Sequence, residues 1–175
     1  MIHLYTGEGK GKTTAAIGLC IRALGRGFRV CFSQFMKGND TGEVYTLENL
    51  SGITILRSEK NFGFYGAMSE ADRRELTEIH NRMLDELLRM AERKACQMMV
   101  LDEVTYPVNW GLLDQEKLKR LLCFGREGTE GEIELVLTGR NAESFLQNAA
   151  DYVTEMECVR HPYERGIQAR IGIEF

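Results

Sequence analysis

Short runs of apolar residues alternate along the chain with longer segments in which apolar residues recur every three to four positions. The short runs predict strands buried on both faces, and the longer period predicts helices that cover them. The predicted strands are Ile2–Thr6, Phe28–Phe35, Ile53–Arg57, Met98–Leu101, Ile133–Thr138 and Tyr152–Glu157. The predicted helices are Lys12–Leu24, a long helix that begins after Ser69, Gln115–Phe124 and Ala142–Ala149. This alternation predicts an α/β fold with a mainly parallel central sheet and helices on both faces.

The same pattern indicates a single domain. Ser69 is placed to cap the long helix, with Asp72 in its first turn. Only two prolines occur, and no linker, repeat or low-complexity segment interrupts the pattern. A length of 175 residues is enough for one substantial core. We therefore expect one domain over residues 1–175.

A glycine-rich loop connects the first predicted strand to the first predicted helix. Its glycines alternate with polar residues, so the backbone can turn N–H groups toward an anion, and the helix N-terminus also favours phosphate. Lys12 adds a mobile positive charge, and Thr13 offers a hydroxyl for Mg²⁺. The loop departs from the usual G-x-x-x-x-G-K-[ST] spacing because Thr6 stands where the first glycine would be. The residues predicted to bind a nucleotide triphosphate are Gly7, Glu8, Gly9, Lys10, Gly11, Lys12, Thr13 and Thr14.

Polar residues stand at the ends of other predicted strands. Gln34, Asp102 and Arg140 would meet the loop at one edge of the sheet, where ligands bind in parallel α/β folds. Gln34 and Arg140 therefore join the residues predicted to bind the nucleotide. Asp102 is predicted to hold Mg²⁺, directly or through water. Glu103 could polarise a water or contact the sugar or the metal, and the sequence does not choose. Arg140 could contact phosphates or substrate, or be a surface arginine after a glycine turn.

Two further groups of residues carry weaker signals. Aromatics and glycines gather in Phe62–Gly66, which suits a mobile flap over a flat ligand, although packing aromatics are the simpler interpretation. His3, His80 and His161 lack metal-ligand spacing and are interpreted as structural.

Composition narrows the classes of partner. The net charge of −4 gives no general attraction to nucleic acid or to an anionic membrane, and no apolar run is long enough to span a bilayer. The chain begins directly with a predicted strand, so we expect no signal or transit peptide. The five cysteines never form C-x-x-C and indicate reduced core residues of a cytoplasmic protein: Cys20, Cys31, Cys96, Cys123 and Cys158.

Five motifs in order resemble the P-loop type of ATP:cob(I)alamin (corrinoid) adenosyltransferase. They are Tyr5–Ala16, Gln34–Gly38, Leu101–Tyr106, Leu137–Asn141 and the tail His161–Phe175. The resemblance covers nearly the whole chain and implies a RecA-like P-loop fold, usually as a homodimer. It implies transfer of the 5′-deoxyadenosyl group of ATP to Co(I) of a corrinoid, either cobalamin or cob(I)yrinic acid a,c-diamide, with release of tripolyphosphate. The resemblance further implies that the reaction belongs to adenosylcobalamin biosynthesis or salvage, and that a flavin-dependent or other reductase supplies Co(I).

The resemblance also implies roles for particular residues. Co(I) is itself the nucleophile, so the protein's task is to bind the leaving triphosphate. Lys12 and the loop would do this, with Mg²⁺ near Thr13 and Asp102. Glu103 would contact the metal or the nucleotide, and Phe64 would face the corrin.

The chain departs from the family in Phe62–Gly66, the aromatic loop. The resemblance implies a Gly-Phe-x-Trp context in which an aromatic pair displaces the lower axial ligand of cobalt. Phe64 matches the first aromatic, but Gly66 stands at the tryptophan position, and Trp110 lies elsewhere in the sequence. Either Tyr65 or another residue substitutes, or the preferred corrinoid lacks a bound lower ligand.

Two other functions remain open from the sequence. A P-loop ATPase or kinase would use Glu103 to activate water or an acceptor, and it would release ADP. An adenosylcobalamin carrier would keep the fold without catalysing transfer, and it would tolerate Lys12→Ala.

Overall fold

The computed structural model describes residues 1–38, 41–126, 128 and 132–174, and its centre is a six-stranded sheet. The strands are β1 (Ile2–Thr6), β2 (Val30–Gln34), β3 (Ile53–Arg57), β4 (Met98–Asp102), β5 (Glu134–Thr138) and β6 (Tyr152–Glu155). Their order is β3-β2-β4-β5-β1-β6, and all neighbours run parallel. The carboxyl ends of the strands therefore meet at one edge, as the sequence predicts. Phe175, the last residue of the resembling tail, lies outside the described residues.

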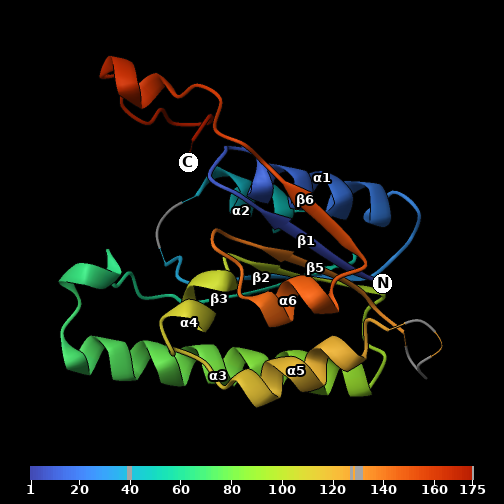
Figure 1. Cartoon of the computed structure of the whole chain (residues 1–175). Coiled ribbons are helices and arrows are strands. Elements are labelled where there is room, and N and C mark those ends of the chain that lie inside the picture. The colour runs from blue at the N-terminus through green and yellow to red at the C-terminus, as the bar shows by residue number, and fades with distance from the viewer. Residues whose placement is uncertain (39–40, 127, 129–131, 175) are drawn as a thin grey trace.

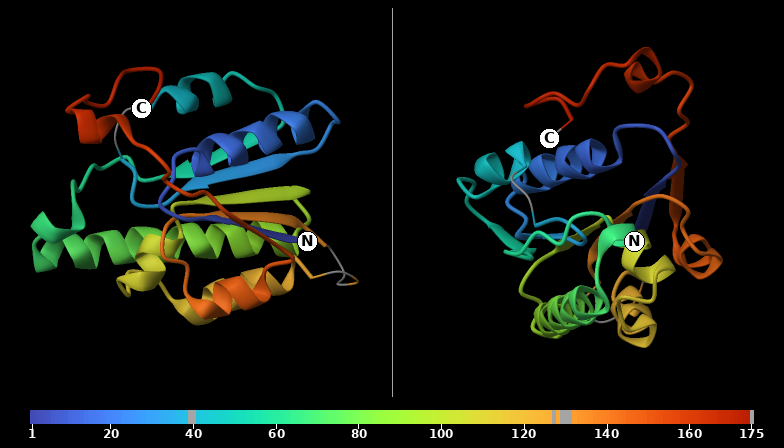
Figure 2. Two further views of the ribbon diagram at one scale, coloured as in Figure 1. Left: turned by 45° about the horizontal axis from the view of Figure 1, so that its top comes forward. Right: turned by 90° about the vertical axis from the view of Figure 1, so that its left-hand side faces the viewer.

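Helices cover both faces of the sheet (Figures 1 and 2). On one face lie α1 (Lys12–Leu24) and α2 (Gly42–Leu47), and on the other lie α3 (Glu70–Glu92), α4 (Thr105–Asn109), α5 (Gln115–Cys123) and α6 (Ser144–Ala149). Each face has its own buried apolar cluster, and the larger one lies under α3 and α5. The predicted α/β fold is confirmed. In the described part of the chain, no helix has the length and apolar character needed to cross a membrane.

The long helix begins as predicted. The Oγ of Ser69 accepts a hydrogen bond from the backbone N–H of Asp72 at 3.1 Å, and the Asp72 carboxylate accepts one from the backbone N–H of Ser69 at 3.2 Å. This reciprocal capping box satisfies two backbone donors that a helix start leaves without partners. It fixes where α3 starts, directly after the aromatic loop.

β6 ends at Glu155 instead of Glu157, and α6 begins at Ser144 instead of Ala142. Three other differences from the predicted pattern have a clear cause. β2 begins at Val30 because the backbone N–H of Phe28 still bonds to Ala23 in the last turn of α1. β6 is exposed along its whole length, so the expectation of burial on both faces is wrong there; as an edge strand it pairs only with β1. The short helices α2 and α4 were not predicted, because five or six residues are too few to display a helical period.

The prediction that all cysteines lie in the core is wrong for two of them. Cys20, Cys31 and Cys96 are buried, and burial raises the pKa of the Cys20 thiol to about 12. Cys123 and Cys158 are exposed. Cys123 ends an amphipathic helix and Cys158 follows the edge strand, so neither position faces a cluster.

His80 is structural, as interpreted from the sequence. It is buried on α3, where its Nε2 accepts from the backbone N–H of Met36 at 3.3 Å and its Nδ1 lies 3.2 Å from the carbonyl oxygen of Leu112. Burial lowers the pKa of His80 to about 4, so the ring is neutral. This neutral ring joins α3 to the loop after β2.

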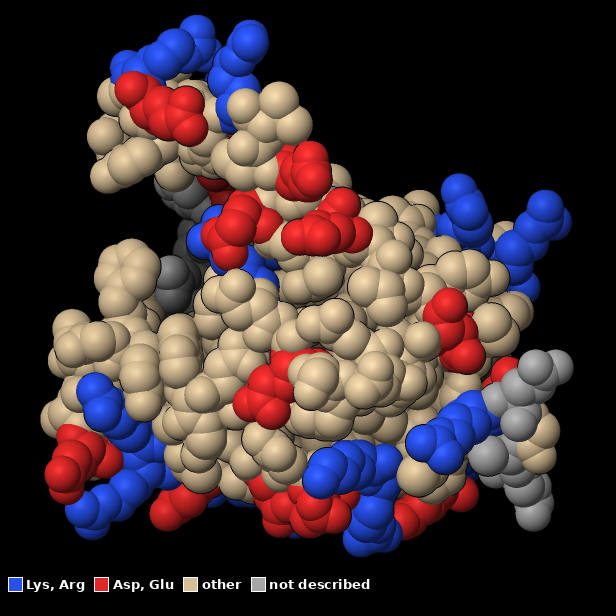
Figure 3. All heavy atoms as spheres, viewed as in Figure 1, with Lys and Arg blue, Asp and Glu red and all other residues tan. Residues whose placement is uncertain are grey.

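Residues 156–174, the C-terminal arm, leave β6 and extend beyond the sheet before returning toward the glycine loop (Figure 1). The space-filling view shows the arm standing apart from the body over a hollow (Figure 3). A short 3-10 helix, Pro162–Arg165, lies within it. The ammonium of Lys10 holds the returning end by donating to the carbonyl oxygen of Ile173 at 2.5 Å and to the carboxylate of Glu174 at 3.2 Å. The arm thus forms one wall above the loop.

Candidate functional site

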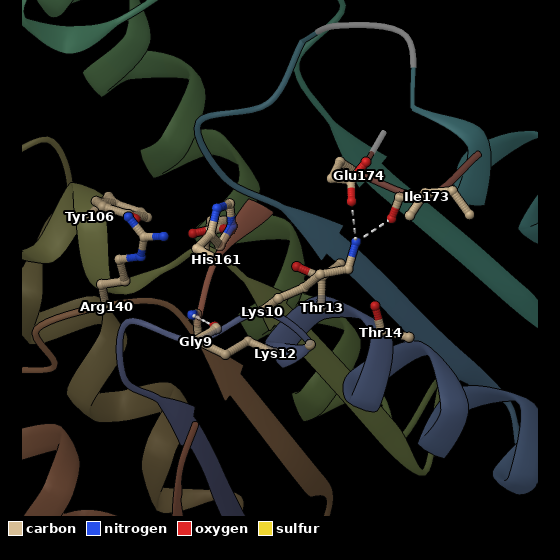
Figure 4. A pocket seen from close by; sticks show the side chains of 12 residues that line it. Gly9, Lys10, Lys12, Thr13, Thr14, Tyr106, Arg140, His161, Ile173 and Glu174 are labelled. Atoms are coloured by element: carbon tan, nitrogen blue, oxygen red, sulfur yellow. Dashed lines mark hydrogen bonds and ion pairs between the residues drawn. The ribbon is translucent and has the colours of Figure 1, made fainter. Parts of the chain in front are cut away.

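The glycine loop lies between β1 and α1 at the carboxyl edge of the sheet. Lys12 turns back into it, and its ammonium donates to the carbonyl oxygens of Gly7 at 2.6 Å and Gly9 at 2.7 Å (Figure 4). Burial, followed by the charge of Arg140, lowers the pKa of Lys12. An ammonium held by neutral carbonyls can exchange them for charged phosphate oxygens, which form stronger hydrogen bonds.

Two of the loop glycines also have a packing role. A Cβ on Gly7 or Gly9 would lie 2.6 Å from the carbonyl oxygen of Met156, at the start of the arm. The N–H of Gly9 donates to that same oxygen. The alternating glycines were interpreted from the sequence as an anion nest alone. In the structure, close approach of the arm explains part of the pattern.

Asp102 is the centre of the polar network behind the loop. It is fully buried at the end of β4. Its Oδ1 accepts from the hydroxyls of Thr13 at 2.8 Å and Thr138 at 2.7 Å. Its Oδ2 accepts from the ammonium of Lys37 at 2.9 Å and from the amide of Gln34 at 3.4 Å. The loop and strands β2, β4 and β5 therefore converge on one carboxylate.

Thr13 and Asp102 could hold a magnesium ion. Both offer hard oxygen atoms, and they lie within 2.8 Å of each other beside the glycine loop. Among the described residues, no group of three or more His, Cys, Asp or Glu side chains could hold a metal alone. Mg²⁺ in nucleotide sites commonly takes one or two protein oxygens and completes its shell with phosphates and water, so this donor set fits it.

A cavity of about 330 Å³ lies above the loop. Its floor is Gly9–Thr14, and Arg140 and Tyr106 close one side (Figure 4). The Nε of Arg140 lies 3.3 Å from the carboxylate of Glu8, so the arginine faces the loop. The arm supplies the remaining wall through His161, Ile173 and Glu174. The interpretation of His161 as merely structural is incomplete, because this ring lines the cavity.

A second cavity of about 430 Å³ adjoins the first and is rich in aromatic side chains. Phe64 stands at its edge with 90% of its surface exposed. Tyr65 stacks on Trp110 with ring centroids 4.3 Å apart and planes 9° from parallel. The residues that line this aromatic cavity are Met36, Lys37, Asn61, Gly63, Phe64, Tyr65, Glu103, Tyr106 and Trp110.

Glu103 stands in the wall between the two cavities, which share it and Tyr106. Its backbone has a φ of 60°, which is unusual for a residue with a side chain, and the hydroxyl of Thr138 accepts from its N–H at 2.9 Å. Within the described part of the chain, its buried Oε2 has no hydrogen-bond partner. Burial, and then the charge of Asp102, raises the pKa of Glu103. A strained backbone and an unpaired buried oxygen indicate a functional position.

Comparisons with known proteins identify the family. The family model described as "ATP:corrinoid adenosyltransferase BtuR/CobO/CobP" matches residues 1–175. The chain belongs to this family. It is 33% identical to the corrinoid adenosyltransferase CobA of Salmonella typhimurium over 178 residues, covering 100% of this chain and 85% of that protein. It is 32% identical to a corrinoid adenosyltransferase of Sinorhizobium over 176 residues, covering 100% of this chain and 80% of that protein.

A solved structure supports the fold. The KaiC-like protein of Pyrococcus horikoshii matches with a TM-score of 0.54 and 15% sequence identity, over 89% of this chain and 70% of that one. At this identity the likeness concerns the fold alone, and it agrees with a RecA-like arrangement of the sheet. The resemblance drawn from the five sequence motifs is thus confirmed for the family, the fold and the main activity, corrinoid adenosyl transfer.

Trp110 packs against the aromatic loop, although the two are far apart in the sequence. Sequence reasoning placed this tryptophan away from the aromatic loop, where Gly66 stands at the family's tryptophan position. The structure brings Trp110 to that loop, because α4 follows β4 and ends at Asn109, directly before Trp110, whose ring stacks on Tyr65. An aromatic from the body of the domain therefore supports a loop that lacks its own tryptophan.

The predicted site residues do not all lie in the same place. Gly9–Thr14, Glu103 and Arg140 line the loop cavity, and Phe64 lines the aromatic one. Gln34 is fully buried behind Asp102, where its amide also donates to Glu43 at 2.8 Å. Its effect on a nucleotide would thus pass through Asp102.

Sequence reasoning missed Lys37, Tyr106 and the arm residues as parts of the site. Lys37 and Tyr106 stand inside two of the resembling motifs, which is the signal that could have found them. The arm residues could not be placed from the sequence because their position depends on how the arm returns.

Proposed function

We propose that the loop cavity binds the triphosphate of ATP and that the aromatic cavity holds the corrinoid, so that transfer occurs at their shared wall. The observation that carries this assignment is that one polar cavity and one aromatic cavity meet at Glu103 and Tyr106. A charged leaving group and a broad apolar ring need two such different surroundings. Family membership supports ATP and a corrinoid as the substrates.

The reaction transfers the 5′-deoxyadenosyl group of ATP to cobalt through its C5′ atom. The electron pair of Co(I) forms a bond to the ribose C5′ of ATP, the bond from C5′ to the phosphate oxygen breaks, and tripolyphosphate leaves with the bonding pair. Cobalt ends formally as Co(III). The protein needs no nucleophile of its own, and its contribution is to orient C5′ and to stabilise the charge that develops on the leaving oxygens.

Several residues serve the leaving group in this proposal. Lys12 leaves the carbonyl oxygens of Gly7 and Gly9 for phosphate oxygens, and Arg140 contacts the triphosphate from one side of the cavity. Thr13 and Asp102 would hold Mg²⁺. When bound, that ion would neutralise part of the charge on the leaving triphosphate. The unpaired oxygen of Glu103 would contact the metal or the nucleotide.

The aromatic cavity fits a flat macrocycle. Phe64 is nearly free of contacts and can lie against a corrin face, while the Tyr65–Trp110 stack holds the loop behind it. Arg73 adds a cation on the Tyr65 ring, 4.5 Å from its centroid. The loop is therefore tied down on one side and presents one aromatic side chain on the other.

Four further statements complete the proposal, and the first three rest on family membership alone. Cobalt must arrive as Co(I), so a flavin-dependent or other reductase acts before transfer. We also propose that the protein works as a homodimer and in the cytoplasm. The preferred corrinoid is one whose lower ligand is absent or displaced, which leaves the lower face open to the aromatic loop.

The position of the corrinoid can be tested by the fluorescence of Trp110, the single tryptophan of the chain. Titration with cob(II)inamide should quench most of its emission, because the corrin absorbs where tryptophan emits. Phe64→Ala should raise the half-quenching concentration about 3–10-fold, since an aromatic contact contributes about 0.5–1.5 kcal/mol.

The matched control is Tyr163→Ala, which removes an exposed aromatic of the arm outside both cavities and should leave the titration unchanged. Corrinoid binding by equilibrium dialysis without quenching, or with equal affinity in Phe64→Ala, would contradict the assignment.

A further inference from the structure

Lys37 places a positive charge on the buried carboxylate of the site. It follows β2 in the chain, directly after Met36, whose φ of 61° turns the backbone at this point. Its ammonium lies 2.9 Å from Oδ2 of Asp102 and 3.9 Å from Oε1 of Glu43. Asp102 is fully buried, and the side chain of Lys37 is 26% exposed. The pair is therefore screened only weakly by solvent.

The other oxygen of Asp102 is also taken. Oδ1 accepts from Thr13 and Thr138, so Lys37 is the cation that balances the carboxylate. A divalent cation bound by Thr13 and Asp102 would share this carboxylate with the ammonium of Lys37. Two like charges so close in a buried setting repel each other. Glu43 also lies near the ammonium, but its Oε1 is 3.9 Å away, against 2.9 Å for Oδ2 of Asp102. Without the charge of a bound ligand, the ammonium and the metal therefore compete for Asp102.

A triphosphate changes this balance. It brings several negative charges into the cavity above Thr13, enough to accommodate both cations. The ammonium of Lys37 can also move away from Asp102 into open space. Lys37 lines the aromatic cavity, which adjoins the loop cavity at Glu103. The ammonium can thus leave Asp102 without entering an apolar core.

We propose that Lys37 is an internal competitor of the divalent metal: it occupies Asp102 while the nucleotide is absent, so that the metal binds only together with the triphosphate. This inference rests on the metal site of the proposed function. It assigns to Lys37 a positioning role that couples metal binding to nucleotide binding. Removing the ammonium should open the carboxylate to a metal on its own.

The test measures binding of Mn²⁺ to the nucleotide-free protein through the electron paramagnetic resonance signal of free Mn²⁺. Lys37→Met should bind Mn²⁺ at least tenfold more tightly than the unchanged protein. In the double variant Lys37→Met/Asp102→Asn the gain should disappear. Equal or weaker binding by Lys37→Met would overturn the proposal, and so would a gain that survives the loss of Asp102.

The matched control is Lys117→Met. Lys117 pairs with Asp85 at 2.7 Å on the surface between α5 and α3, so this change also leaves a carboxylate without its lysine. It should not increase Mn²⁺ affinity. A gain equal to that of Lys37→Met would mean that any freed carboxylate captures the ion, and it would overturn the specific role of Lys37.

If Lys37→Met is poorly stable, its unfolding temperature with and without Mn²⁺ provides a second test. The variant should unfold at a lower temperature than the unchanged protein, and Mn²⁺ alone should raise that temperature while leaving the unchanged protein unaffected. No rise with Mn²⁺ would contradict the proposal. Because neither measurement uses ATP or a corrinoid, the role of Lys37 can fail while adenosyl transfer stands. Conversely, a failure of transfer would leave these metal measurements intact.

Discussion

Replacing Lys12 with alanine is expected to lower the rate of adenosyl transfer by about 10²–10³-fold, the usual effect of removing one charge-stabilising group from an active site. The reason is the leaving group, which is a whole triphosphate whose charge grows as the C5′–O bond breaks. Lys12 is the cation that lies inside the loop, held by the carbonyl oxygens of Gly7 and Gly9. The measurement is the formation of adenosylcorrinoid under anaerobic conditions, with saturating ATP and reduced cobinamide.

The control for Lys12 is Lys119→Ala. Lys119 lies on α5, pairs with Glu116 at 2.7 Å and lines neither cavity. Its loss should leave the rate within about twofold, as surface substitutions usually do. A near-normal rate for Lys12→Ala would refute the role of the loop as holder of the leaving group.

Replacing Asp102 with asparagine is the second change with a large expected effect. The substitution keeps the shape and removes the charge, so transfer should fall about 10²-fold at ordinary Mg²⁺ and recover in part when Mg²⁺ is raised. It also leaves the ammonium of Lys37 without its anion. Stability should drop by about 2 kcal/mol, less than for a fully buried pair because Lys37 is partly exposed.

Two measurements separate these effects of Asp102→Asn. The dependence of transfer rate on Mg²⁺ reports metal retention, and urea unfolding without nucleotide reports the lost ion pair. The hydroxyls of Thr13 and Thr138 can rotate to suit an amide, which limits the loss of hydrogen bonds. An unchanged Mg²⁺ dependence would contradict the assignment of the metal to Thr13 and Asp102.

Local patterns in the sequence correctly predicted most of the strands and helices and the position of the glycine loop. Apolar runs located the strands β1 to β5, and the less apolar segment Tyr152–Glu157 located the exposed edge strand β6. The capping pair Ser69 and Asp72 located the start of α3. The glycine loop was placed because strand, loop and helix are contiguous in the chain. A parallel sheet then gathers strand ends at one edge, so the meeting of Asp102 with the loop followed from topology.

Other parts of the site depend on long-range packing that no local pattern records. Trp110 reaches Tyr65 only because α4 follows β4 and ends directly before Trp110, and the sequence shows a separation of 45 positions between them. His161 reaches the loop because the arm passes across Gly7 and Gly9. Lys37 was missed because a lysine after a strand looks like any surface lysine until its carboxylate partner is placed.

The most direct test of the central claim is the identity of the phosphorus product in a single turnover. The protein is incubated without oxygen with ATP and chemically reduced cobinamide, and the products are followed by phosphorus NMR and by the absorbance of the corrinoid. The account predicts tripolyphosphate in equal amount to adenosylcobinamide, with no ADP. Release of ADP and phosphate, or intact ATP beside a protein that only binds preformed adenosylcorrinoid, would contradict it.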